Sequence, residues 1–169
     1  MTEAIVTSRL ADVRVQRAIE LIWREAYLLD KKDYVEWKDL YADDAIYVIP
    51  VDASTNDFDN ALNMVFDDKR LREERVKRLI EGYAISAVDA ANTVRTVSRF
   101  MPVAVTDEIV EIAAGQVVVA FKRGRHDLWA ADVEYTIRLG VSEGDDQIAR
   151  KVIRLIDSDS PVPAAGFLL

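Results

Sequence analysis

Apolar residues near the start of the chain recur at the spacing of a helix. They stand at positions i, i+3, i+4, i+7, i+11 and i+14, as Val15, Ala18, Ile19, Ile22, Ala26 and Leu29. This spacing places them on one face of a helix that Asp12 is positioned to cap. A second, short helix is predicted after Asp33, which has Glu36 three residues further on, as in a capping box. Its buried side would consist of Tyr34, Trp37, Leu40 and Tyr41.

The pattern changes from helical to alternating in the second half of the chain. In "LWAADVEYTIRLG", residues 128–140, apolar and polar positions alternate, which predicts a half-buried strand. Residues 93–105, 109–122 and 147–156 are rich in Val, Ile and Thr and predict three more strands. The tetrapeptide "EGDD" is expected to form a hairpin turn before the last of them.

The middle of the chain gives weaker signals. The stretch "AIYVIP" predicts a strand that stops at Pro50. Residues 51–66 lack a clear period, so we predict an irregular segment there. A third helix, "KRLREERVKRLIE", is predicted to be capped by Asp68 and ended by Gly82.

Helices therefore come first and strands afterwards, without regular alternation of the two. This order is typical of an α+β domain. We predict a strongly curved, mainly antiparallel sheet that about three helices cover on one face. The whole chain, 1–169, is expected to be one domain, with helices mainly in 12–82, the sheet mainly in 83–157 and a C-terminal tail over 158–169.

Two groups of apolar residues need cover in such a domain. The tail ends in Phe167, Leu168 and Leu169, which we expect to pack against another surface. The sheet face opposite the helices would be apolar if it carried Val94, Phe100 and Val118, and this predicts self-association.

Composition excludes several classes of function. The chain has 22 Lys and Arg against 30 Asp and Glu, a net charge of −8, which disfavours nucleic acid and anionic membranes as partners. The one basic run, "KRLREERVKR", is interrupted by Glu73 and Glu74. There is no cysteine, no secretory signal pattern at the N-terminus and no apolar run of membrane-spanning length, so we expect a cytoplasmic protein.

The stretch "EAYLLDKKDYVEWKDLYADDAIYVIP", residues 25–50, has the composition of a pocket lining. In one interpretation Asp43 or Asp44 is a general base, and Tyr27 or Tyr47 donates a hydrogen bond to a developing enolate. In the other, which the sequence favours, the two aspartates form an exposed turn and the aromatic residues fill the core.

Other catalytic chemistries have few residues to draw on. His126 is the only histidine, and its surroundings, "KRGRHDLW", predict a solvated hairpin tip. A Rieske cluster needs two cysteines and two histidines, and a mononuclear iron triad needs two histidines and a carboxylate, so the sequence can supply neither. It also lacks a glycine-rich phosphate loop and a GxSxG motif.

Four motifs in order resemble one family. They are "REAYLLDKKDYVEWKDLYADDAIYVIP", "FDDKRLREERVKRLIEG", "RTVSRF" and "RKVIRLIDSD", and together they cover most of residues 20–160. The sequence resembles the small, or beta, subunit of bacterial aromatic-ring-hydroxylating dioxygenases. It departs from the family pattern at Arg99, where the family has asparagine.

The resemblance implies a cone of the cystatin-like or NTF2-like kind and a non-catalytic structural role in the terminal oxygenase, in degradation of an aromatic compound. It implies no cofactor on this chain, a homotrimer, and a large subunit that holds the Rieske 2Fe-2S cluster and the mononuclear iron. From charge and position, Arg75, Arg78 and Arg95 are predicted to contact that partner. The alternative is a stand-alone isomerase, dehydratase or cyclase of the same fold, with Asp44 and Tyr47 as its catalytic residues, or a protein that only binds a ligand in an apolar cavity.

Overall fold

The computed structural model describes residues 9–85, 91–160 and 167–169. In chain order the elements are a 3₁₀ turn Arg9–Ala11, α1 Val13–Lys31, α2 Tyr34–Asp39, β1 Tyr41–Pro50, β2 Asn63–Asp67, α3 Lys69–Ile85, β3 Asn92–Val105, β4 Ile109–Lys122, β5 Arg125–Arg138, a second 3₁₀ turn Glu143–Asp145 and β6 Gln147–Leu155. The fold is the predicted α+β arrangement.

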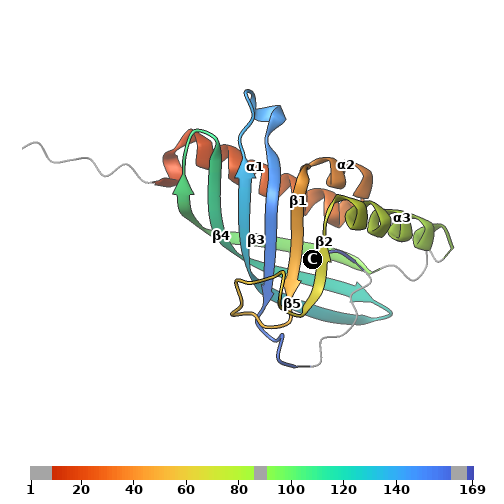
Figure 1. Ribbon diagram of the computed structural model, residues 1–169. Coiled ribbons are helices and arrows are strands. Elements are labelled where there is room, and N and C mark those ends of the chain that lie inside the picture. Colours follow the sequence, from red (N-terminus) through yellow and green to blue (C-terminus); the bar gives the residue numbers. More distant parts are fainter. Residues whose placement is uncertain (1–8, 86–90, 161–166) are drawn as a thin grey trace, which may run out of the picture.

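All six strands belong to one sheet in the order β2-β1-β6-β5-β4-β3. The β1–β6 pair is parallel and the other pairs are antiparallel. The sheet curls around one side, on which the three helices lie (Figure 1). We call the side of the sheet that faces the helices the inner face, and the opposite side the outer face. The predicted curved sheet with helices on one side is confirmed.

Side chains at the predicted helix starts hold the first turns in place. Asp12 accepts a hydrogen bond from the backbone N–H of Arg14 at 2.9 Å, Asp33 from that of Glu36 at 3.3 Å, and Asp68 from that of Leu71 at 2.9 Å. All three caps that the sequence predicted are therefore confirmed.

The predicted end of the third helix at Gly82 is wrong, because α3 continues to Ile85. Glycine in a helix interior costs only about 1 kcal/mol relative to alanine, so one glycine does not end a helix.

The prediction that 51–66 is irregular also needs correction. Its last residues belong to β2, which pairs with β1 over Val48↔Phe66 and Ile49↔Val65. A strand of five residues is too short to show a period.

The hairpin between β4 and β5 lies where the sequence placed it. Lys122 pairs with Arg125, which leaves Arg123 and Gly124 as a two-residue turn. Both turn residues have positive φ, 51° and 77°, as a type I′ turn requires. The predicted turn at "EGDD" lies in the connection between the antiparallel strands β5 and β6, where Glu143–Asp145 form a 3₁₀ turn.

Alternate residues of β3, β4 and β5 point to opposite faces. One row across these strands, Arg95, Val118 and Trp129, is buried on the inner face. The next row, Val94, Val119 and Leu128, lies on the outer face, where Val94 is 70% and Leu128 66% exposed.

The expectation for the outer face was thus right for Val94 and wrong for Val118, which is fully buried. Phe100 is half-buried and packs edge-to-face on Trp23 of α1, with ring centroids 5.8 Å apart. For Phe100 the reason is a bulge in β3 between Ser98 and Met101, which shifts the alternation of that strand. Val118 lies on β4, and alternation alone does not tell from the sequence which of the two sets of residues in a strand faces the helices.

Candidate functional site

Glu25 is the charged centre of the inner face. It projects from α1, is only 1% exposed, and accepts five hydrogen bonds on its two carboxylate oxygens. The donors are the indole of Trp37 at 3.2 Å, the hydroxyls of Tyr41 at 2.6 Å and Tyr135 at 2.9 Å, and the ammonium of Lys151 at 3.0 and 3.1 Å. We call these five residues the inner-face cluster.

The sheet register brings the basic and phenolic members together. Lys151 of β6 pairs with Tyr47 of β1 on one side and with Tyr135 of β5 on the other. All three side chains therefore stand in one row on the inner face, and all are at most 2% exposed. Glu25 reaches this row from the helix that covers it.

The cluster favours an ionised pair. Burial alone would raise the pKa of Glu25, but the ammonium of Lys151 and hydrogen bonds from Tyr41, Lys151 and Tyr135 outweigh it, so the pKa lies below its usual value. Burial lowers the pKa of Lys151, and Glu25 opposes that effect. Burial, followed by the negative charge of Glu25, raises the pKa of both Tyr41 and Tyr135, which keeps them protonated donors.

Such a carboxylate is poorly suited to general base catalysis. An efficient base has a pKa near the working pH and a lone pair directed at the substrate. The pKa of Glu25 is lowered, and four donor groups already make five hydrogen bonds to its oxygens. Its arrangement is that of an anchor between helix and sheet.

Residues Phe167–Leu169, which we call the tail, lie against the same face. The main-chain oxygen of Leu169 accepts hydrogen bonds from Tyr47 at 2.7 Å and from Lys151 at 3.0 Å. Phe167 packs edge-to-face on Trp129 with centroids 5.8 Å apart. Leu168 and Leu169 are buried members of the main core, so the predicted docking of these apolar residues occurs within the chain itself.

A second ion pair on the inner face, between Arg95 and Asp30, also contacts the tail. Arg95 of β3 donates to Asp30 of α1 at 2.9 Å and to the main-chain oxygen of Leu168 at 3.0 Å. Its side chain is only 1% exposed. Arg95 was predicted to contact a partner subunit, whereas in this structure its guanidinium is directed inside the chain.

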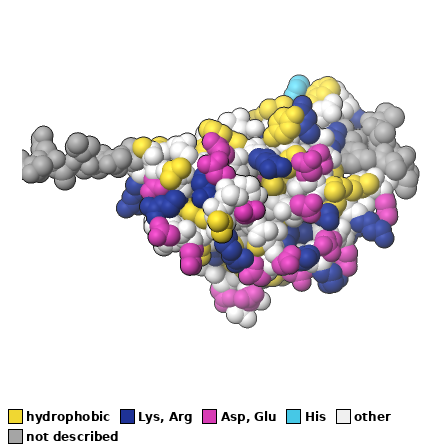
Figure 2. Space-filling view, turned by 90° about the horizontal axis from the view of Figure 1, so that it is seen from above, with side chains coloured by type: hydrophobic (Ala, Val, Ile, Leu, Met, Phe, Trp, Pro, Cys, Tyr) yellow, Lys and Arg dark blue, Asp and Glu magenta, His cyan; other side chains and the backbone are white. Residues whose placement is uncertain are grey.

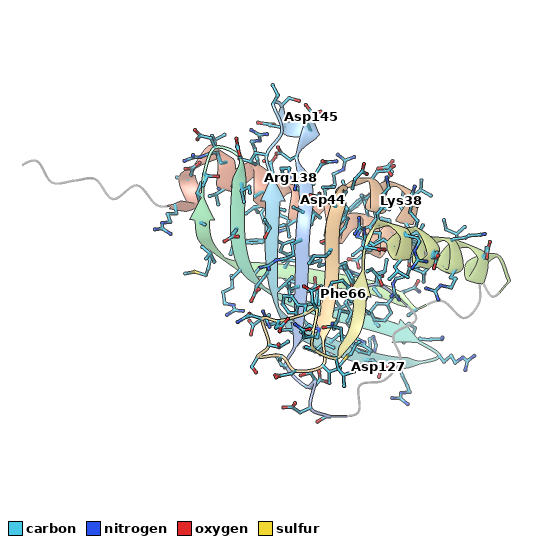
Figure 3. The ribbon with its side chains drawn as sticks, viewed as in Figure 1. Lys38, Asp44, Phe66, Asp127, Arg138 and Asp145 are labelled. Atoms are coloured by element: carbon cyan, nitrogen blue, oxygen red, sulfur yellow. The ribbon has the colours of Figure 1, made fainter. Side chains whose placement is uncertain are left out.

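The structure places the candidate catalytic residues apart. Asp44 is exposed and forms a two-fold ion pair with Arg138, at 3.0 and 3.1 Å (Figure 3). The hydrogen bond from Arg138 lowers the pKa of the Asp44 carboxyl. Tyr47 is buried at the inner face, and burial raises its pKa. Asp43 pairs with Lys69 at 2.8 Å on the surface, and Tyr27 is 61% exposed.

The remaining predicted residues lie on the outside. His126 is exposed beside the ring of Phe121, with centroids 4.8 Å apart, just after the hairpin turn. Arg75 forms a two-fold ion pair with the buried carboxylate of Asp67, and Arg78 is exposed on α3.

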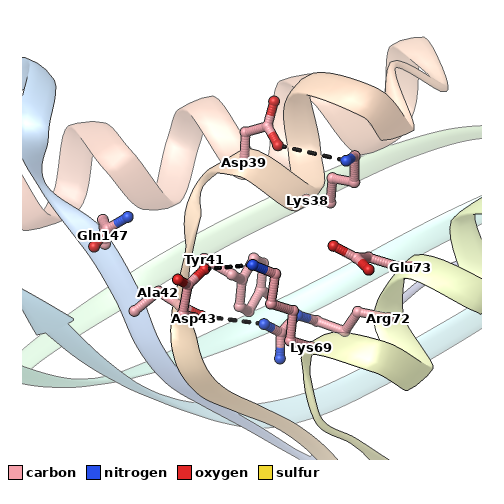
Figure 4. A pocket seen from close by; sticks show the side chains of 9 residues that line it. All are labelled: Lys38, Asp39, Tyr41, Ala42, Asp43, Lys69, Arg72, Glu73 and Gln147. Atoms are coloured by element: carbon pink, nitrogen blue, oxygen red, sulfur yellow. Dashed lines mark hydrogen bonds and ion pairs between the residues drawn. The ribbon is translucent and has the colours of Figure 1, made fainter.

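A surface hollow of about 280 Å³ lies between α2, β1 and α3 (Figure 4). Charged side chains line it and pair with one another, as Lys69 does with Asp43 and Lys38 with Asp39. Arg72 donates to the main-chain oxygens of Ala42 and Ala45. These contacts join α3 to β1 and make the hollow a structural junction.

The surface mixes charges of both signs, as Figure 2 shows for one face. Over residues 9–85, 91–160 and 167–169, no group of three or more His, Cys, Asp or Glu side chains is arranged to hold a metal ion. In the same residues no helix combines the length and apolar character that crossing a membrane would require.

The inner-face cluster was not predicted from the sequence, although both charged members, Glu25 and Lys151, stand at positions where the pattern places apolar residues. Glu25 falls on the apolar face of its helix, between Ile22 and Leu29. Lys151 alternates with Ile153 and Leu155 on the buried side of β6. Opposite charges on two apolar faces that pack together would have predicted a buried ion pair.

The fold and its filled inner face define a class: a cystatin-like, NTF2-like cone. An NTF2-like protein with a cystatin-like fold from Novosphingobium aromaticivorans superposes with a TM-score of 0.60 and 16% identity, over 86% of this chain and 83% of that one. A model of the ring hydroxylating beta subunit family matches residues 24–160. The chain belongs to that family, as the sequence motifs predicted.

Two proteins of known function are similar to this chain over most of its length. The small oxygenase component of the p-cumate 2,3-dioxygenase system of Pseudomonas putida is 28% identical over 121 residues, which is 70% of this chain and 67% of the relative. The beta subunit of the benzoate 1,2-dioxygenase from Burkholderia mallei has a TM-score of 0.75 and 18% identity, and the match covers 93% of this chain and 97% of that one.

Proposed function

We propose that this chain is the non-catalytic structural subunit of a ring-hydroxylating dioxygenase that degrades an aromatic compound in the cytoplasm. Three copies would assemble with three large subunits, which carry the Rieske cluster and the catalytic iron. The observation that carries this role is the filled inner face. Where an enzyme of this shape would need an open cavity, the chain places a saturated ion pair and its own tail.

The geometry gives less support to a stand-alone isomerase or dehydratase. That function needs a base and a donor on the same side of the sheet. Asp44 is held at the surface by Arg138, while the hydroxyl of Tyr47 is directed into the inner face toward Leu169. The two groups cannot meet one small substrate in this arrangement.

The outer face supports self-association. Val94, Val117, Val119, Phe121 and Leu128 form an apolar patch on it, the outer patch, and each is between 38% and 70% exposed. Exposed apolar groups that adjoin one another mark interaction surfaces.

The free edge of β3 is less suited to that contact, because α1 covers it. The backbone N–H of Arg95 donates to Asp30 at 2.9 Å, and the indole of Trp23 donates to the carbonyl of Val97 at 3.4 Å. An edge whose groups are bound in this way does not pair with another strand.

For the large subunit, α3 is the more suitable surface. Arg78 is exposed there, and Arg75 stands one turn before it with its guanidinium oriented by Asp67. Oriented guanidinium groups make two-fold hydrogen bonds with carboxylates of a partner.

Co-expression with the cognate large subunit tests this function. We expect the two chains to purify together, in equal numbers, with iron and a Rieske-type visible spectrum, and the small chain alone to be a trimer by light scattering. The variant Val94→Glu/Leu128→Glu should be a folded monomer, since it puts charge into the outer patch. The control Val141→Glu, at a fully exposed loop position, should remain a trimer.

A monomeric unaltered chain at micromolar concentration would contradict the trimer. A large subunit that purifies fully assembled and active without this chain would contradict the structural role.

A further inference from the structure

A groove with apolar walls lies on the side of the molecule, between α1 and the edge strand β3. It encloses about 330 Å³, and its walls include Trp23 and Tyr27 of α1 and Thr96 and Val97 of β3. The two aromatic side chains are 53% and 61% exposed, while Val97 and the neighbouring Ala26 are buried. Exposed aromatic side chains beside a buried apolar floor are typical of an interaction surface. We call this surface the edge groove.

The edge groove adjoins the outer patch. The exposed side chain of Thr96 lines the groove and lies on the same face of β3 as that of Val94, a member of the outer patch two residues earlier. The two surfaces therefore meet along β3. They face in different directions, because the outer patch is directed away from the helices and the groove opens beside the strand.

The two surfaces differ in shape. Because the sheet curls around the helices, its outer face is convex (Figure 1), whereas the edge groove is a hollow. Two convex faces touch over a small area only, so a contact between two outer patches would be poorly packed. A convex patch and a hollow fit each other over a larger area, as stable interfaces require.

A three-fold ring needs two different surfaces on every copy, because each copy contacts one neighbour with each of them. The outer patch exposes on the order of 400 Å² of apolar surface, close to the apolar part of one partner's share of a standard interface, which is about 57% of about 800 Å². The patch is therefore sufficient for one contact, and the other contact requires a second surface. Pairing patch with patch would also leave Trp23 and Tyr27 in water.

We propose that the edge groove binds the outer patch of a second copy of this chain, so that three copies close into a ring. The inference rests on the three-copy assembly proposed above and adds which surfaces meet. Phe121 and Leu128 of one copy would lie against Trp23 and Tyr27 of the next. Side chains make this contact, since the backbone of β3 at this edge remains bound by Asp30 and Trp23.

Light scattering of two variants, alone and mixed, tests this pairing. The patch variant Val94→Glu/Leu128→Glu has an intact groove, and the groove variant Trp23→Gln/Tyr27→Glu has an intact patch. Each alone should be a monomer. Their equimolar mixture should contain a dimer of one copy of each, because the intact patch of the groove variant can occupy the intact groove of the patch variant. The mixture is measured at about 100 μM, since a single contact lacks the effective concentration that ring closure supplies.

The control for the groove variant is Val35→Glu on α2. Val35 is 51% exposed, close to the value for Trp23, but it lies outside the groove, so this variant should remain a trimer. Circular dichroism checks that the groove variant is folded. If it is not, Tyr27→Glu/Thr96→Glu, which substitutes two exposed positions of the same groove, takes its place.

Two results would overturn the proposal: a folded groove variant that is still a trimer, or an equimolar mixture that contains only monomers. Both are distinct from failure of the proposed function, which would show as a monomeric unaltered chain. A trimeric unaltered chain with a trimeric groove variant would leave the three-copy assembly in place and remove the edge groove from it.

Discussion

The two faces of strands β3, β4 and β5 serve opposite purposes with neighbouring residues. On the inner face Val118 is fully buried, whereas Val119, the next residue of β4, is 38% exposed on the outer face. Charges also differ between the faces. The inner face holds two ion pairs, Glu25–Lys151 and Asp30–Arg95, while the outer face carries exposed apolar groups beside surface ion pairs such as Arg99–Asp132.

The two faces therefore have different roles in the molecule. The ion pairs on the inner face connect the helices and the tail to the sheet, and the exposed apolar groups of the outer patch lie where a partner can cover them. An enzyme of this fold would need an open cavity on the inner face to hold its substrate. The chain is built to be part of a larger assembly.

The largest expected effect comes from breaking the central ion pair on one side only. Lys151→Met leaves the carboxylate of Glu25 buried without a counter-charge, which should lower the free energy of unfolding by about 3–5 kcal/mol. The double variant Glu25→Gln/Lys151→Met removes both charges and should lose much less. Urea denaturation measures both, and a single variant as stable as the double would show that the pair is not ionised.

The pH dependence of stability also tests whether Glu25 is ionised in the folded chain. The pKa of Glu25 is lowered in the folded chain, so its contribution is present above the unfolded-state pKa and is lost as the pH falls through the folded-state pKa. We expect the free energy of unfolding to fall in acid below about pH 4.5, the ordinary pKa of the group. The fall should be shallower in Glu25→Gln/Lys151→Met. Exposed carboxylates with lowered pKa remain in both proteins, so equal acid profiles would contradict this role of Glu25.

Substitutions of two adjacent residues of β4 compare the contributions of the two faces to stability. Val118→Ala removes two buried methyl groups and leaves a cavity, which should cost about 1.5–3 kcal/mol. Val119→Ala should change the stability of the dissociated chain by less than about 0.5 kcal/mol. Thermal unfolding of the two variants in the Val94→Glu/Leu128→Glu background measures this, and equal losses would mean that the outer patch is core.

The smallest expected effect concerns the bulge of β3. Arg99 has φ of 56°, a left-handed conformation that asparagine adopts more readily than arginine. Arg99→Asn should raise the free energy of unfolding by up to about 0.5 kcal/mol, although it removes an exposed ion pair with Asp132. Arg99→Ala, which loses the ion pair and gains no such preference, should be slightly less stable than the unaltered chain.

Local patterns predicted most of the elements of the fold. The helical spacing of α1, the cap at Asp68 and the alternation of β5 are properties of neighbouring residues, and all three are present. The bulge at Ser98 and the short strand β2 were missed, since each depends on the partner strand that fixes its register.

The inner-face cluster was harder to predict for the same reason. Glu25 and Lys151 are 126 positions apart, and only the packing of α1 on β6 brings them within 3.0 Å. The sequence named Tyr47 as a donor but could not say which side of the sheet it faces, nor that the tail would accept its hydrogen bond.

We infer that the interior of the small subunit supports the assembly and takes no part in the reaction. The most direct measurement is the hydroxylation rate per iron of the oxygenase reconstituted with the Glu25→Gln/Lys151→Met small subunit. We predict a rate within about twofold of the unaltered oxygenase, with the same subunit composition. A loss of about a hundredfold or more, with assembly and iron content unchanged, would place the chemistry on this chain and contradict the account.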